Sequence, residues 1–221
     1  MGLCKNLVFI ADKHVRHPIM TVFSSEINDH LPSVLGMKLK SMAGWNQLES
    51  DWKMLLDAGG DNFVASLDGN DVGIAISLPY QDHFTWMAMV LVDPGARRKG
   101  VGKTLMNKSI ELAEPKTPIR LDATPEGFEL YRKLGFQTEY ELVRLIKSSA
   151  VSKVRQKHHP AEPGIPMGDL ELESIALLDI PIFGADRSGI LRSMYGRNPE
   201  YACYRKENGT IRAYCLGRSG S

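Results

Sequence analysis

The longest apolar stretch of the chain covers residues 84–92, where Thr85 is the only polar side chain. A run of this length without alternation is typical of a strand that is buried on both faces of a sheet. Shorter apolar runs at residues 63–65 and 72–78 flank Asp68-Gly69, a dipeptide that is typical of β-turns. The pattern therefore predicts a hairpin followed by a central strand.

Downstream of the central strand the apolar spacing changes to that of a helix. A helix is predicted from about Val101, with Val101, Leu105, Met106 and Leu112 on its apolar face, and Pro115 ends it. A short strand at residues 119–123, a second helix at 125–134 and a final strand or pair of strands at 136–146 follow. The order is that of an α/β (α+β) domain with helices on a mixed sheet.

The beginning of the chain has a weaker pattern. Residues 6–10 fit a first strand, and residues 20–36 have spaced apolar positions that fit a helix up to Pro32. Residues 44–47 are predicted to form a loop. Ser50 is then a suitable N-cap for a short helix that contains Trp52.

The character of the chain changes again after residue 147. Residues 148–168 contain Ser, Pro and a basic cluster without periodicity, and we expect a linker there. Residues 169–179 and 187–195 are predicted to be helical, and a hairpin is predicted around Asn208-Gly209. Residues 187–216 repeat the order predicted for residues 51–78: a helix, a strand that starts with an aromatic residue, a glycine turn and a second strand. The domains are therefore 1–147, a linker at 148–168, and a smaller unit at 169–221.

The hairpin allows a register prediction. A two-residue Asn208-Gly209 turn pairs Cys203 with Tyr214 and Ala202 with Cys215. The two cysteines then lie on opposite faces of the ribbon, so we expect free thiols.

Composition narrows the class of protein. Of the 221 residues, 43% are hydrophobic and 24% charged, which excludes disordered, collagenous and coiled-coil chains. A net charge of +1 favours neither nucleic acid nor anionic membrane as a partner. No apolar run approaches the ~20 residues of a membrane span. Three cysteines without CxxC spacing indicate no metal site and fit a reducing, cytoplasmic setting.

The segment that carries chemistry begins where the central strand ends. Asp93-Pro94-Gly95 breaks the strand, and a basic, glycine-containing turn then starts the next helix. Backbone amides at a helix start, together with glycines that allow close approach, form a binding place for phosphate groups. Arg97, Arg98, Lys99 and Lys103 add positive charge. The pattern indicates a diphosphate site.

Two nucleotide-binding motifs fit this segment poorly. A P-loop reads G-x-x-x-x-G-K-[ST]; Gly102-Lys103-Thr104 supplies its end, but Arg97 stands where the first glycine is required. A Rossmann G-x-G-x-x-G motif would need a third glycine at Leu105. A P-loop nucleotide-binding protein is kept as an alternative function.

The segment instead resembles the [RQ]-x-x-G-x-[GA] signature of the GNAT acetyltransferases, here Arg97-x-x-Gly100-x-Gly102. Tyr131-x-x-x-Gly135-Phe136 resembles the closing Y-x-x-x-G-F of the same family. The resemblance covers roughly residues 40–146. It implies a GNAT fold, and residues 169–221 resemble the start of the second GNAT-like domain found in one branch of the family, here incomplete.

The resemblance implies an acetyl-CoA-dependent N-acetyltransferase that moves an acetyl group to a primary amine. The pantetheine arm would pair with the backbone of Val90 and Val92, the pyrophosphate would meet the turn, and the thioester carbonyl would lie near Met89. Tyr131 matches the position of the catalytic acid. The residues assigned to cofactor binding are Met89, Val90, Leu91, Val92, Arg97, Arg98, Lys99, Gly100, Val101, Gly102 and Lys103.

The acceptor and the catalytic base are not identified by the sequence. Residues 86–89 contain no titratable group, so Asp82, His83 and Asp122 are the candidate bases. Trp45 and Trp86 are candidates for an acceptor pocket and equally for the core. We expect a small-molecule or peptide amine as partner, with a homodimer possible. A GNAT-fold protein that binds CoA without catalysis is a further alternative.

Overall fold

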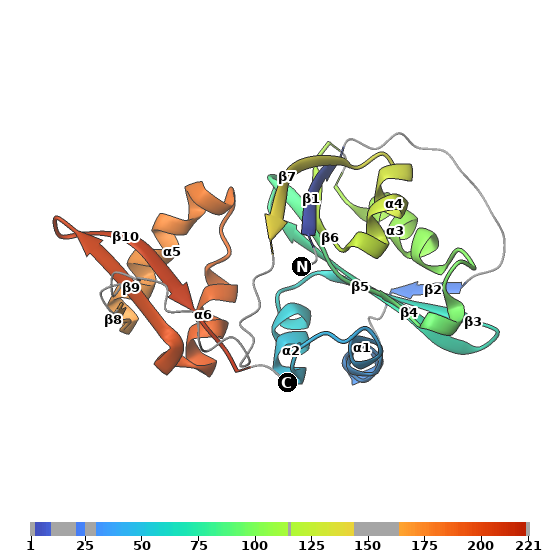
Figure 1. The fold of residues 1–221 in the computed structure, drawn as a ribbon, viewed down its shortest axis with the longest axis horizontal. Coiled ribbons are helices and arrows are strands. Elements are labelled where there is room, and N and C mark those ends of the chain that lie inside the picture. Colours follow the sequence, from blue (N-terminus) through green and yellow to red (C-terminus); the bar gives the residue numbers. More distant parts are fainter. Residues whose placement is uncertain (1–2, 10–20, 25–29, 115, 144–163, 220–221) are drawn as a thin grey trace, which may run out of the picture.

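The computed structural model describes residues 3–9, 21–24, 30–114, 116–143 and 164–219, which form two units (Figure 1). The first unit contains strands β1 (Leu3–Phe9), β2 (Thr21–Ser24), β3 (Asp61–Leu67), β4 (Asn70–Tyr80), β5 (Phe84–Val92), β6 (Ile119–Ala123) and β7 (Gln137–Val143). Its helices are α1 (His30–Met42), α2 (Glu49–Asp57), α3 (Val101–Leu112) and α4 (Pro125–Lys133), with a 3₁₀ turn η1 (Pro94–Ala96). The second unit contains β8 (Ile165–Pro166), α5 (Asp169–Phe183), α6 (Ser188–Arg197), η3 (Pro199–Tyr201), β9 (Ala202–Glu207) and β10 (Thr210–Leu216).

The first unit is a helix–sheet–helix sandwich. Its sheet has the order β2-β3-β4-β5-β6-β1-β7, and every neighbouring pair is antiparallel except β5 and β6. Helices α1 and α2 cover one face, and α3 and α4 cover the other (Figure 1). This confirms the predicted α/β fold with a mixed, mostly antiparallel sheet and helices on both sides.

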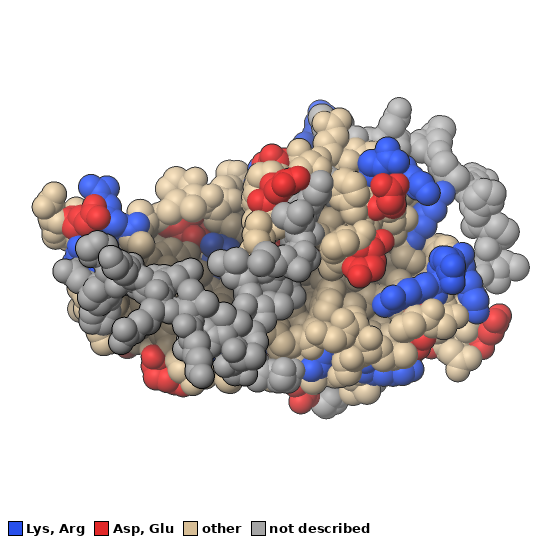
Figure 2. All heavy atoms as spheres, in the orientation of Figure 1, with Lys and Arg blue, Asp and Glu red and all other residues tan. Residues whose placement is uncertain are grey.

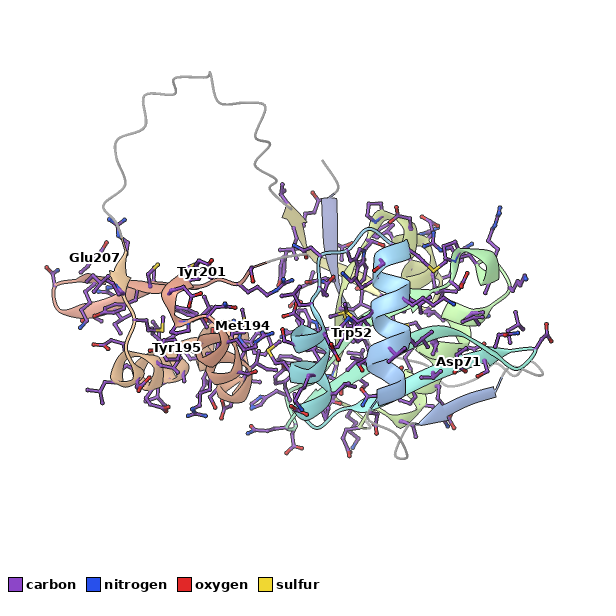
Figure 3. All side chains as sticks on the ribbon, turned by 90° about the horizontal axis from the view of Figure 1, so that it is seen from below. Trp52, Asp71, Met194, Tyr195, Tyr201 and Glu207 are labelled. Atoms are coloured by element: carbon purple, nitrogen blue, oxygen red, sulfur yellow. The ribbon has the colours of Figure 1, made fainter. Side chains whose placement is uncertain are left out.

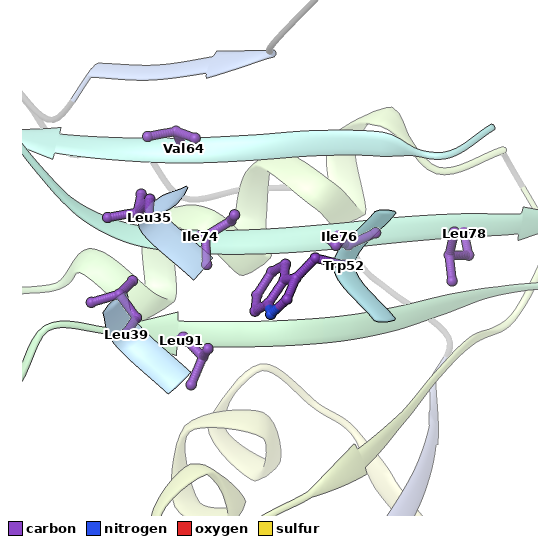
Figure 4. Packing of buried hydrophobic residues seen from close by; sticks show 8 residues of the cluster. All are labelled: Leu35, Leu39, Trp52, Val64, Ile74, Ile76, Leu78 and Leu91. Carbon is purple, nitrogen blue, oxygen red and sulfur yellow. The ribbon is translucent and has the colours of Figure 1, made fainter. Parts of the chain in front are cut away.

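The face under α1 and α2 is organised around Trp52. Its indole is fully buried and packs with Ile74, Ile76 and Leu91 between α2 and the sheet (Figure 4). A Cβ built on Gly36 of α1 would lie 2.6 Å from the Trp52 ring, so only glycine allows α1 to approach the indole this closely.

Two predictions for the beginning of the chain are wrong. Residues 20–36 do not form one helix: residues 21–24 form strand β2, which pairs with β3, and α1 starts at His30. Pro32 lies in the first turn of α1, where a missing N–H costs nothing, so it does not end the helix. Ser50 is also not the N-cap of the next helix: α2 begins at Glu49, and Leu48 is its N-cap, with the Leu48 N–H donating to the Asp51 carboxylate at 2.9 Å.

The C-terminal unit repeats the order and pairing of the first part of the chain. Elements β8-α5-α6-β9-β10 follow one another as β2-α1-α2-β3-β4 do, and β8 pairs antiparallel with β9 as β2 does with β3. The predicted linker lies outside the described residues except for its last few positions, of which residues 165–166 form β8. The repeat therefore includes a strand before its two helices, which the sequence pattern did not reveal.

The predicted register of the C-terminal hairpin is wrong by one residue. Thr210 pairs with Glu207 as expected, but an extra residue between Ile211 and Ala213 shifts every later pair. Cys215 therefore lies opposite Cys203, and not opposite Ala202. Both thiols are free; the side chain of Cys4 lies outside the described residues.

The C-terminal unit contacts the first unit along α2. Asp51 accepts an Arg197 guanidinium N–H at 2.8 Å and forms an ion pair with Arg218 at 3.1 Å, although its side chain is only 6% exposed. Met194 lies on the side of α6 that faces α2 (Figure 3). One buried carboxylate thus links two parts of the C-terminal unit, the end of α6 and the segment after β10, to the first unit.

We predict that Gly36→Ala destabilises the protein by about 1–2 kcal/mol, because the new methyl group overpacks against Trp52. Gly196→Ala in α6 is the matched control: its Cβ would meet nothing within 4 Å, and alanine is the better helix former. Thermal unfolding is the measurement. If both variants melted above the wild type, the close packing of α1 on Trp52 would be contradicted.

Candidate active site

Strand β5 has a bulge at its centre. Ile74 pairs with Leu91 but Ile76 pairs with Ala88, so β5 has one residue more than β4 between these pairs. Met89 within it has a φ of +51°, which is uncommon for a residue other than glycine. A bulge bends its strand and changes the direction of the backbone groups beyond it.

Beyond the bulge, β5 separates from β6. The parallel ladder between them joins Thr85, Trp86 and Met87 to Ile119–Leu121 and ends there. Past this point the Asp93 N–H donates to the Val72 carbonyl of β4 at 2.8 Å. Because backbone groups alternate along a strand, Val90 and Val92 direct theirs away from β4, toward the side that β6 has left. An open strand edge is thereby available for an extended ligand.

The open edge leads into the basic turn. Asp93 caps η1 by accepting the Gly95 N–H at 2.8 Å, and the Arg97 Nε lies 3.4 Å from the Val92 carbonyl. Arg98 and Gly100 both have positive φ, at +63° and +88°. Gly100 is the N-cap of α3 and provides no side-chain cap, so the first-turn amides of this helix have no side-chain acceptor.

Positive charge surrounds these amides. Arg97, Arg98, Lys99 and Lys103 are all exposed, and none of them forms an ion pair with a carboxylate of the described residues. Figure 2 shows Lys and Arg side chains gathered over the region where Figure 1 places α3 and the turn before it. The Val101 side chain, by contrast, is 1% exposed and belongs to the core, so only its amide faces the turn.

Tyr131 lies on α4, on the same side of the sheet as this turn. It shares a core cluster with Met87, against which Val90 also packs, and its ring stands 5.8 Å from that of Phe136. Burial raises the pKa of the Tyr131 hydroxyl to about 12. The group therefore keeps its proton at neutral pH and can act only as a proton donor there.

This arrangement of strand, turn and helix matches known proteins. The family model of the acetyltransferase (GNAT) domain matches residues 58–138. The uncharacterized N-acetyltransferase YitH of Bacillus subtilis (strain 168) is 30% identical over 207 residues, which cover 89% of this chain and 69% of YitH. The chain belongs to the GNAT acetyltransferase family.

Other relatives agree with this assignment. Holothin acyltransferase of Pseudoalteromonas sp. (strain SANK 73390) is 40% identical over 67 residues, 30% of this chain and 22% of that protein. A Pyrococcus horikoshii structure assigned as an acetyltransferase shares the fold at a TM-score of 0.62 and 19% identity, covering 87% of this chain and 66% of that one. This GNAT chain thus spans about two thirds of the length of YitH and of the Pyrococcus protein. Acyl transfer is the reaction class of the family.

The candidate bases of this GNAT chain lie in different places. Asp82 and His83 are exposed in the turn between β4 and β5, about 20 Å of strand before Met89. Asp122 is exposed on β6, one residue past the end of its ladder with β5. Leu121 and Ala123 point into the core with Tyr131, so Asp122 points to the opposite face. Only Asp122 is therefore close to the gap between the two strands.

The C-terminal unit reaches this opposite face with an aromatic side chain. Phe183, at the end of α5, lies 5.0, 5.3 and 5.9 Å from the rings of Tyr80, Phe84 and Trp86. Arg187 stacks on Phe183 at 4.0 Å and forms two hydrogen bonds with Asp179, at 2.7 and 2.9 Å. No local pattern in the sequence indicated Phe183, because its partners lie about a hundred residues earlier.

A cavity of about 360 Å³ opens beside this contact, between the ends of α2 and β4 and the start of α6. Trp86 thus contacts the C-terminal unit, whereas Trp45, in the loop after α1, is half-buried against the core under α1 and α2.

Within the described residues no group of side chains fits a metal ion, and no helix is both long and apolar enough to cross a membrane.

We predict that Tyr131 makes stability depend on alkaline pH. Its pKa is about 12 in the folded protein and about 10 in an unfolded chain, so its contribution is complete below pH 10 and is lost as the pH rises toward 12. Between pH 8 and 11 the wild type should lose on the order of 1 kcal/mol more of its unfolding free energy than Tyr131→Phe. Urea unfolding at the two pH values measures this, and equal losses would contradict the burial of the hydroxyl.

Proposed function

We propose that this chain is an acetyl-CoA-dependent N-acetyltransferase that acts on a primary amine. The observation that supports this most is the continuity of the open edge of β5 with the basic turn at the start of α3. An extended thioester with a diphosphate at its far end fits these two features together.

Each part of the co-substrate has its counterpart in the chain. The pyrophosphate oxygens would accept hydrogen bonds from the backbone amides of Arg98 to Lys103. The exposed lysine and arginine side chains of the turn would lie around the pyrophosphate. The pantetheine arm would add to β5 through the backbone of Val90 and Val92. The thioester carbonyl would then lie beside Met89, where the bulge redirects the backbone.

The reaction is a direct transfer. The amine nitrogen attacks the thioester carbonyl carbon, the new C–N bond forms, and the C–S bond breaks with its electron pair on sulfur. Tyr131 donates a proton to the departing thiolate, since burial keeps its hydroxyl protonated. Asp122 first accepts one proton from the ammonium of the acceptor, directly or through a water molecule, from the opposite face of the sheet, and so frees the amine that attacks. The nitrogen loses a second proton to water once the C–N bond has formed, and Tyr131 regains its proton from the solvent.

The acceptor would approach on the face that carries Asp122 and Trp86. Phe183 then forms part of its boundary, so the C-terminal unit contributes to the choice of amine.

We predict that Gly100→Asp weakens acetyl-CoA binding at least tenfold more than Gly100→Asn. Both side chains tolerate the left-handed conformation of residue 100, and a Cβ there meets nothing within 4 Å, so the two variants differ in charge alone. A carboxylate beside the pyrophosphate is repelled by it. Calorimetry with acetyl-CoA and with ATP measures both affinities. Equal binding of acetyl-CoA by the two variants would contradict the phosphate site, and binding of ATP alone would favour a nucleotide-binding protein.

We predict that Tyr131→Phe lowers kcat about 100-fold or more while the KM for acetyl-CoA stays unchanged, because the hydroxyl acts only on the leaving thiolate. Release of free CoA across a panel of amines is the measurement. Gly127→Ala should also lower kcat, since its Cβ would lie 2.8 Å from Tyr131 Cε2 and displace the ring. Tyr140→Phe, on an exposed tyrosine of β7, is the control. Acetyl-CoA binding without CoA release for any amine would show a non-catalytic CoA-binding protein.

We predict that Asp122→Asn lowers kcat/KM for the amine at neutral pH and that higher pH restores much of the rate, because more of the amine is then already deprotonated. Asp82→Asn, in the exposed turn before β5, is the matched control. A pH–rate profile of Asp122→Asn that coincides with that of the wild type would exclude Asp122 as the proton acceptor.

A further inference from the structure

Two free cysteines face each other across the C-terminal hairpin. Cys203 of β9 and Cys215 of β10 are direct cross-strand partners. Two positions further along, the Gly217 N–H donates to the Tyr201 carbonyl at 3.0 Å, so 201/217 is a hydrogen-bonded pair. Such pairs recur at every second position, which makes 203/215 one as well, with the Cα atoms about 5.5 Å apart and both side chains on one face.

The Cα spacing lies within the range of a disulfide. Bridged cysteines have Cα atoms about 4.4–6.8 Å apart and Cβ atoms about 3.5–4.5 Å apart. Directly opposite residues have Cβ atoms about 4.5–5.5 Å apart, so the two strands must draw slightly together at this pair when the bridge closes. The residue inserted between Ile211 and Ala213 creates the pairing, since the uninterrupted register would place the thiols on opposite faces. We propose that Cys203 and Cys215 form a reversible disulfide, a modification site that is independent of the proposed transferase activity.

Access to the pair is asymmetric. Cys215 is exposed, whereas Cys203 is half-buried beneath the backbone of Gly164, where a built Cβ would lie 2.7 Å from Cys203 Sγ. A soluble oxidant therefore reaches Cys215 first, and Cys203 is the resolving thiol. Gly164 leaves just enough room for the Cys203 sulfur, so a larger residue there would disturb the pair.

The reaction is thiol–disulfide exchange with a small-molecule disulfide of the glutathione type. The Cys215 thiolate attacks one sulfur of the oxidant, which forms a mixed disulfide and releases one thiol. The Cys203 thiolate then attacks the Cys215 sulfur and releases the second thiol. The protein loses two electrons and two protons, and the oxidant is reduced to two thiols.

The position of the bridge relates it to the contact between the two units. The chain enters β9 shortly after Arg197 and leaves β10 just before Arg218, and both arginines bind Asp51 of α2. Figure 3 shows the hairpin extending from Tyr201, on the side of the first unit, to Glu207 at its far end. A disulfide between residues 203 and 215 would fix the end of the hairpin from which both docking arginines extend.

The full chain, purified reduced and then incubated with oxidised glutathione, tests the proposal. Peptide mass spectrometry after alkylation should find an intramolecular 203–215 disulfide and the loss of two alkylatable thiols, reversed by dithiothreitol. Cys203→Ser should stop at a glutathione adduct on Cys215, and Cys4→Ser should leave the bridge intact. The oxidised protein should unfold several degrees above the reduced one.

An exchange of Cys215 with its neighbour supplies a control that keeps both thiols in the hairpin. The double variant Cys215→Leu/Leu216→Cys moves the second thiol by one position and therefore to the opposite face of the ribbon, so bridge formation should fall at least tenfold in a variant whose circular dichroism remains that of the wild type. The proposal is overturned if the wild type keeps both thiols alkylatable, if each acquires a separate adduct, if the disulfide joins two chains, or if the folded double variant bridges as fast.

Discussion

The bulge at Met89 is the feature on which the candidate site depends. One additional residue in β5 keeps the strand hydrogen-bonded to β4 while its second half leaves β6. Without it, β6 would continue to pair with β5, and the backbone groups of Val90 and Val92 would have partners within the sheet. The same change of direction ends the strand at Asp93, so that the turn and α3 lie at the end of the open edge.

The positive φ at Met89 has an energetic cost, since residues other than glycine rarely adopt it. Packing compensates for this cost on both faces of the strand. Met89 and Leu91 pack under α1 and α2, beside Trp52, whereas Val90 and Val92 pack on the side of α3 and α4. Packing of the core on both faces of β5 therefore stabilises the bulge that exposes the edge of this strand. The close contact between Gly36 and Trp52 is part of this packing.

The parts of this site that depend on local sequence were predictable. Residues 84–92 form a buried strand because their side chains are almost all apolar, and the helix after Gly100 follows from the glycines and the spacing that begins at Val101. The bulges in β5 and β10 were not predictable from the sequence, because neither Met89 nor Arg212, the unpaired residue of β10, is a glycine or belongs to a turn motif. The role of Phe183 was equally unpredictable from the sequence, since only the docking of the C-terminal unit brings it into contact with Trp86.

The most direct test of the account is hydrogen exchange of the backbone amides with and without acetyl-CoA, followed by mass spectrometry with residue-level fragmentation. If the thioester adds to β5 and its diphosphate binds the turn, the amides of Val90, Val92 and Arg98 to Lys103 should be protected together, while those of β9 and β10 remain unchanged. Saturating acetyl-CoA that leaves the amides of β5 and the turn unprotected, or that protects another region instead, would contradict the assignment of the site.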